Sequence, residues 1–251
     1  MERQPTESAR LAARDYPKRN ALPIMEQQWR NLLFLHWEYD SALIQKTLPQ
    51  GLFVDQFEGK AYVTLSPFWV PKVTLKMMPA IPGLSQFLEL NLRTYVYDEK
   101  GTPGVWFYSL DANHFLATQA AKLFYYLPYR YAKIHSFLNK EEQIEFSCLR
   151  EGTQAILNYR YQGAGPYQMA EAGSLEFFLI ERYILFASKG KNLALGHIHH
   201  APYSLCQPQV WQWDDRLFEL DGLSRPQRSP DFMHFSPGVD VNIFALQEIS
   251  K

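Results

Sequence analysis

The sequence of 251 residues contains only two cysteines, Cys148 and Cys206. They lie far apart and form neither a CxxC pair nor the ligand spacing of a zinc site. A disulfide-stapled fold of the secreted type is not indicated. We therefore expect two free thiols, as in a protein of a reducing compartment.

An excess of charge of either sign is also missing. The formal net charge is −1, the sequence pI is about 6.7, and 20% of the residues are charged. Nothing in this balance attracts a polyanion, so we expect no nucleic-acid partner. In contrast, hydrophobic residues make up 47% and aromatic residues 15% of the chain, which is enough for a sizeable core.

No segment is long and apolar enough to predict a membrane span. The first residues, MERQPTESARLAARDYPKRN, lack the apolar region of a secretory signal, and their acidic residues argue against a transit peptide. The most apolar run, LEFFLIERYILFAS, is too short to cross a bilayer and carries Glu181 and Arg182 at its middle. We predict a cytoplasmic protein with no membrane partner, whose residues 1–22 form a polar, partly disordered arm.

Several catalytic signatures are absent as well. The chain has no GxSxG nucleophile elbow, no Walker loop and no HExxH, and GAGPYQ lacks the spacing of a dinucleotide fingerprint. We therefore expect no cofactor and no kinase, redox or zinc-protease chemistry.

What the sequence does contain is a series of short strand patterns. We predict hairpins at residues 53–68, 89–112 and 182–200, and an irregular, proline-containing tail at 222–237. About ten short strands with a few helices are typical of an α+β fold in which a mainly antiparallel sheet curves or closes into a β-barrel. No repeat or linker divides the chain, so we predict one domain over residues 23–251.

The strand pattern ELNLRTYV has one polar face, formed by Glu89, Asn91 and Arg93, with Tyr95 following on the same side. These side chains could meet water or line a cavity. The next strand, GVWFYSLDA, is aromatic on both faces, which is typical of a covered central strand. A covered neighbour must pair its charges or bind something, because unpaired buried charge is costly.

Two further patterns have a polar character. His197 and His199 alternate in HIHH and could chelate a metal, but a third ligand would have to come from elsewhere, so we predict no metal site. Glu181 lies beside the basic residue Arg182 in the apolar run LEFFLIERYILFAS. It could pair with Arg93 or Arg130, or supply a second acid or base to a cavity.

Seven stretches of the chain form a set, namely LLFLHWEYD, LPQGLFVDQFEGKAYVTLSPF, ELNLRTYV, GVWFYSLDA, LPYRYA, FLIERYILFAS and HHAPYSL. Taken together, they resemble the uncharacterised YqjF-like family, a domain of unknown function. The resemblance covers residues 29–205. That family is similar to the acetoacetate decarboxylase-like superfamily. The resemblance implies a cone-like β-barrel with flanking helices and a small internal cavity.

Acetoacetate decarboxylases form a Schiff base through a lysine whose pKa is depressed by a second lysine and an apolar pocket. The matching stretch here, LPYRYA, has Tyr129 and Arg130 after the proline, and neither can form the imine. The resemblance therefore implies that decarboxylase activity is missing, unless Lys122 or Lys133 reaches the cavity. It also implies that Glu89 is the acidic residue that lines the cavity.

We therefore predict a cavity for a small-molecule ligand, with an anionic group as one option. Glu89 would be the acid or base, and Arg93, with Arg130, would position the anion. The residues expected to orient the ligand are Asn91, Tyr95, Ser109, Asp111 and Glu181. The sequence leaves open whether the protein is an acid–base enzyme on a small oxygenated or carboxylated compound, a ligand sensor or carrier, or an interaction protein with a filled barrel. It also leaves open a homo-oligomer.

Overall fold

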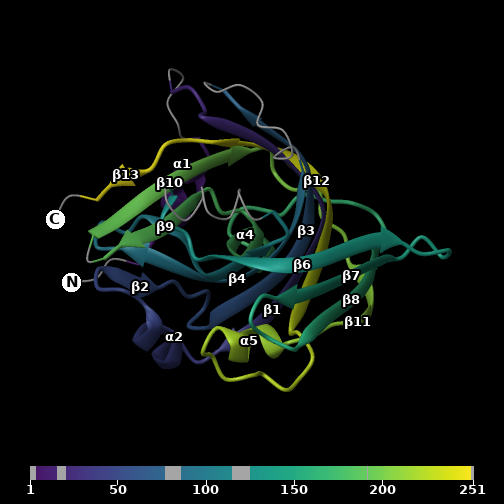
Figure 1. The fold of residues 1–251 in the computed structure, drawn as a ribbon. Helices are drawn as coiled ribbons and strands as arrows, with labels where there is room; N and C mark the ends of the chain where they lie inside the picture. The colour runs from purple at the N-terminus through teal and green to yellow at the C-terminus, as the bar shows by residue number, and fades with distance from the viewer. Residues whose placement is uncertain (1–3, 16–20, 77–85, 115–124, 191, 250–251) are drawn as a thin grey trace.

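The computed structural model describes residues 4–15, 21–76, 86–114, 125–190 and 192–249. Within them, seven strands pair into a closed ring in the order β5, β9, β10, β12, β1, β3, β4 and again β5 (Figure 1). Their bounds are β1 Met25–Tyr39, β3 Ala61–Leu75, β4 Phe87–Asp98, β5 Pro103–Ala112, β9 Ile184–Lys189, β10 Asn192–His200 and β12 Phe232–Ile243. Neighbours in the ring are antiparallel except β5 and β9.

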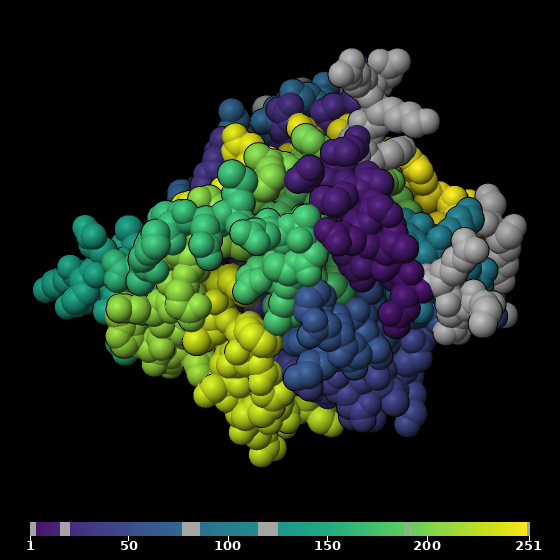
Figure 2. Space-filling model, turned by 180° about the vertical axis from the view of Figure 1, so that it is seen from behind, coloured from purple at the N-terminus to yellow at the C-terminus, as the bar shows by residue number. Residues whose placement is uncertain are grey.

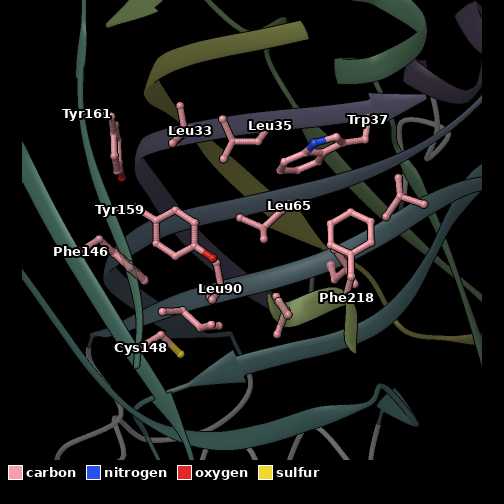
Figure 3. Packing of buried hydrophobic residues seen from close by; sticks show 14 of the residues in the cluster. Leu33, Leu35, Trp37, Leu65, Leu90, Phe146, Cys148, Tyr159, Tyr161 and Phe218 are labelled. Atoms are coloured by element: carbon pink, nitrogen blue, oxygen red, sulfur yellow. The ribbon is translucent and has the colours of Figure 1, made fainter. Parts of the chain in front are cut away.

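A second layer of sheet covers part of the outside of this ring. It begins at β6, whose first residues pair in parallel with the end of β5, and continues through β7, β8 and β11. The bounds are β6 Tyr129–Leu138, β7 Ile144–Arg150, β8 Ile156–Gly163 and β11 Pro208–Gln212. The outward side chains of β1, β3 and β4 pack against this layer (Figure 3). Among them, Leu35, Leu65 and Leu90 are fully buried. Helix α5 (Arg216–Leu220) adds Phe218, whose ring lies 5.2 Å from that of Trp37.

The inside of the ring holds a separate apolar cluster and helix α4 (Leu175–Ile180) (Figure 1). Ser174 caps this helix by accepting from the amide of Phe177, and the last four residues of the helix are buried. A six-residue helix has little stability of its own, so packing inside the ring must hold it in place.

The remaining elements are α1 (Glu7–Arg14), α2 (Ser41–Thr47), β2 (Leu52–Val54) and β13 (Gln247–Glu248). Helix α1 lies within the predicted polar arm but docks on the folded domain. Arg10 forms an ion pair of 2.5 Å with the buried Asp55, and Ala13 is buried. Figure 2 shows this N-terminal segment, in purple, lying across the back of the molecule.

The structure confirms the predicted hairpins formed by β4 with β5 and by β9 with β10. The predicted hairpin at 53–68 is confirmed at its turn, where Phe57 and Lys60 form a bridge, but its first arm is wrong, because β2 pairs with β4 and not with β3. The predicted irregular tail is wrong for its last residues, because β12 begins at Phe232. The strand accommodates Pro237 through a local irregularity, in which Asn31 on the facing strand and Gly238 both have positive φ. Every helix in the described part of the chain is too short or too polar to cross a membrane.

Candidate functional site

A cavity of about 460 Å³ lies inside the ring. Most of its wall is apolar, with Trp29, Phe68, Phe87 and Phe107 as the larger side chains. Ligand pockets of this kind commonly have volumes of a few hundred cubic ångströms and only a few polar groups.

Strand β4 supplies three polar side chains to the cavity. Glu89, Asn91 and Arg93 all line it, with exposed fractions of 4%, 5% and 8%. They alternate with Leu90 and Leu92, which point to the outer core, as the period of a strand requires. The polar face that the sequence indicated therefore looks into the ring and not into water.

Among the described residues, Glu89 has no cation in its hydrogen-bond shell. Its two oxygens accept from Asn91 Nδ2 at 3.2 Å and from the Tyr129 hydroxyl at 3.1 Å. Burial raises the pKa of Glu89 to about 7, while these two hydrogen bonds act in the opposite direction. A carboxyl group in this state can take up and release a proton near neutral pH.

Arg93 is buried without satisfying its hydrogen-bonding groups. Neither Nε nor Nη2 has a hydrogen-bond partner in the described part of the chain, and the guanidinium carbon lies 5.5 Å from the ring centre of Phe34. Asn91 Oδ1 and Ser66 Oγ, on the same cavity wall, also lack hydrogen-bond partners among the described residues. Buried polar atoms are nearly always paired, so these are the atoms best placed to bond to a ligand.

A second arginine, Arg182, also reaches the cavity. It donates from Nη1 to Asp55 at 2.9 Å and from Nε to the carbonyl of Phe178 at 2.7 Å, while Nη2 has no partner among the described residues. Its guanidinium lies over the rings of Tyr95 and Phe178, at 4.9 and 4.3 Å. Arg182 is not among the site residues predicted from the sequence. Its only signal was a charge within an apolar run.

A β-bulge in β5 changes which residues face the cavity. Leu92 pairs with Ser109, but Arg93 pairs with Phe107, so Tyr108 is the extra residue. Beyond the bulge the alternation is shifted by one residue. Val105, Phe107, Leu110 and Ala112 therefore line the cavity.

The expectation that Ser109 and Asp111 orient a ligand is therefore corrected. Both are buried on the opposite face, where they contact Arg150. Arg150 donates to both oxygens of Asp111 at 2.9 and 3.0 Å, to Asp221 at 2.7 Å and to Ser109 Oγ at 2.7 Å. Ser109 in turn donates to Asp221. We call these four residues the Arg150 network. Burial raises the pKa of Asp111 to about 6, and Arg150 acts against this rise.

Three other expected site residues lie outside the cavity wall. The Tyr95 hydroxyl is bonded to Thr64 at 2.6 Å and to the carbonyl of Leu179 at 2.7 Å. Glu181 accepts from the hydroxyl of Tyr183 and the amide of Tyr203, and pairs with neither of the expected arginines. Arg130 is exposed, because its neighbour on β6, Tyr129, is the residue that faces Glu89.

The alternatives based on histidine and lysine find little support. His197 is buried whereas His199 is exposed, and no group of three potential metal ligands occurs among the described residues. Lys133 is exposed on β6 and does not line the cavity. Lys122 lies outside the described residues. Both cysteines are buried and free.

The ring with its internal cavity defines a class of protein, the acetoacetate decarboxylase-like fold. The enduracididine biosynthesis enzyme MppR, solved with the condensation product of pyruvate and imidazole 4-carboxaldehyde, superposes with a TM-score of 0.65 at 12% identity, over 91% of this chain and 90% of that one. Acetoacetate decarboxylase from Legionella pneumophila gives a TM-score of 0.62 at 14% identity, over 92% of this chain and 88% of that one. At these identities the similarity shows the fold alone.

Sequence similarity is more specific. The chain belongs to the DUF2071 family, described as an uncharacterized conserved protein, which matches residues 26–240. It is 34% identical over 227 residues to the uncharacterized protein YqjF of Bacillus subtilis (strain 168), covering 90% of this chain and 93% of that protein. Both the family and the fold implied by the sequence resemblance are confirmed.

Proposed function

We propose that the protein binds a small organic anion in the ring cavity and that Glu89 serves as a general acid or base toward it. The observation that carries the proposal is the Arg93 guanidinium, which is buried in an apolar wall with two nitrogens unpartnered among the described residues. A buried cation with unsatisfied donors is costly. A carboxylate ligand would supply an opposite charge and accept two parallel hydrogen bonds from the planar guanidinium.

The spacing of Glu89 and Arg93 supports this arrangement. Four residues separate them, about 13 Å along a strand. They can therefore contact different parts of one ligand. Arg182 adds a further nitrogen that has no partner within the described part of the chain. A proton acceptor with a pKa of about 7 beside a bound anion is suited to moving a proton at a carbon or oxygen atom of that ligand.

Schiff-base chemistry is not part of the proposal. The cavity wall formed by described residues includes arginines but no lysine. Arginine remains protonated and does not form an imine. The acid–base role of Glu89 requires neither a lysine nor an imine.

The first test is thermal unfolding and calorimetric binding with acetate, pyruvate, acetoacetate and a lactone panel. We would compare wild type with Arg93→Met and with the control Arg228→Met, in which an exposed arginine paired with Asp231 is replaced. A ligand at 100 times its dissociation constant should stabilise wild type and the control by about 2.7 kcal/mol. Arg93→Met should lose this gain. Equal gains in all three proteins would contradict the anion site.

Catalysis needs a separate measurement. In D₂O, NMR can follow exchange of the carbon-bound hydrogens of a bound keto acid, whatever overall reaction the protein carries out. We expect exchange with wild type and at least a hundredfold slower exchange with Glu89→Gln, a loss within the range that general acid–base catalysis contributes. Tight binding without any exchange or turnover would make the protein a carrier or sensor.

A further inference from the structure

The two ends of the cavity differ in polarity. Arg93, Arg182 and Asn91 are buried at one end, and Glu89 lies between them and the other end. Among the described residues, that other end is lined by Ile24, Met25, Val73, Leu75, Ile198 and Ile243. A polar neighbour, Gln27, is already bonded to the indole nitrogen of Trp29 at 2.8 Å and to the sulfur of Met25 at 3.4 Å.

Exposure also increases toward the apolar end. Phe34, beside Arg93, is fully buried, whereas Met25 is partly exposed and Ile24 is 37% exposed. The apolar end is therefore the mouth of the cavity and the arginines form its floor. A ligand that fits this order enters with its anionic group first and leaves an apolar part near the mouth.

The length of the cavity indicates an elongated ligand. Along β1 its wall runs from Phe34 to Met25, about 30 Å of strand, or roughly 20–25 Å along the axis of a ring with strands tilted as in barrels. A ligand that contacts both the arginines and the mouth must therefore be extended and not compact.

We propose that the ligand of this site is an amphipathic monocarboxylate with an extended hydrocarbon tail, held with its carboxylate at Arg93 and Arg182 and its tail against the apolar residues of the mouth. The inference rests on the proposed function, because it uses the same anion site. It places Glu89 next to the first part of the tail, since Glu89 lies on the mouth side of Arg93 along β4.

The experiment is a chain-length series. Calorimetric titration with straight-chain alkanoates from acetate upward, below their micelle-forming concentrations, should show the dissociation constant falling about fourfold per methylene, equivalent to about 0.8 kcal/mol each. The fall should stop at the length at which the tail reaches the mouth. Alkanols of the same lengths should bind at least tenfold more weakly, because they lack the charge that Arg93 recognises.

A variant at the mouth sharpens the test. Ile198→Phe, at a partly exposed position, should move the plateau to shorter chains, whereas the control Arg228→Met, outside the cavity, should keep the plateau of wild type. An affinity independent of chain length, with short acids still bound through Arg93, would overturn the tail assignment and leave the proposed function intact. Absence of binding by any acid would remove both. Affinity that rises without a plateau, in wild type and variant alike, would indicate surface adsorption and also overturn the assignment.

Discussion

Strands β4 and β5 carry buried polar residues on both of their faces, and the two sets differ in how completely they are bonded. In the Arg150 network, every charged group is paired with one of opposite sign, and the serine bonds to both Arg150 and Asp221. In the cavity, Glu89 and Arg93 are buried to a similar degree, but Arg93 keeps two unpartnered nitrogens among the described residues. The two sets have similar residue types and similar burial. They differ in hydrogen bonding: the fully bonded Arg150 network can stabilise the fold, whereas the incompletely bonded cavity residues can bind a ligand.

The largest expected effect comes from a substitution that breaks the Arg150 network. Arg150→Met would leave the carboxylates of Asp111 and Asp221 buried without their cation, and we expect a loss of about 3–5 kcal/mol in the free energy of unfolding. Urea unfolding at pH 8 measures this loss. The loss should shrink at pH 5, where Asp111, with its raised pKa, takes up a proton. A loss below about 1 kcal/mol at pH 8 would show that the network does not stabilise the fold.

The next effect concerns the charge of Glu89. Its pKa is raised from 4.5 to about 7, so the folded protein binds the proton more tightly than the unfolded chain, and this contribution to stability falls as pH rises from about 4.5 to 7. Glu89→Gln removes the dependence. At pH 8 the variant should be more stable than wild type by about 3 kcal/mol, since one pKa unit corresponds to about 1.4 kcal/mol. At pH 4.5 the two should be nearly equal. Parallel stability curves would contradict the raised pKa.

Two buried serines allow a smaller comparison. Ser109→Ala removes the acceptor of one Arg150 nitrogen and should cost about 1–2 kcal/mol. Ser66→Ala removes a hydroxyl that has no partner among the described residues, so it should change the free energy of unfolding by less than about 0.5 kcal/mol. Chemical unfolding of both variants at one pH gives the difference. Equal costs would mean that Ser66 is bonded in solution, for example to water.

Of the two buried arginines, Arg93 should show the smaller effect in the ligand-free protein. Arg93→Met removes an incompletely bonded cation and replaces the apolar stem of the side chain, so the free energy of unfolding should stay within about 1 kcal/mol of wild type or rise. Side-by-side unfolding of Arg93→Met and Arg150→Met tests the comparison directly. A loss as large as that of Arg150→Met would place Arg93 in a structural set and remove the basis for the anion site.

The cavity face of β4 could be predicted from sequence because it depends only on strand alternation. Glu89, Asn91 and Arg93 are two residues apart, and the strand containing them is regular on that face. The hairpin to β5 and the hairpin at the end of the apolar run were also predictable, because turn residues separate two adjacent strand patterns.

The errors have a common physical origin in long-range pairing. The bulge at Tyr108 has no signature in the alternation of β5, and the partner of Asp111 is Arg150, 39 residues away. Helix α1 reads as a polar arm because its docking depends on Asp55, a buried residue outside that segment. Arg182 could not be assigned to the cavity before the position of α4 inside the ring was known. Local patterns thus identify which face of a strand is polar, but not what lies opposite it.

The bulge at Tyr108 gives β5 an unequal tolerance of changes in length. Loss of this one residue would make the pairing with β4 regular and would leave the other side chains of β5 on their present faces, because Phe107 and Ser109 already face opposite sides. Loss of Leu110, in the regular part of the strand, would instead turn Asp111 into the cavity and take a carboxylate away from Arg150. Relatives shortened by one residue at the bulge would therefore keep the chemistry of both faces, whereas relatives shortened beyond it would not.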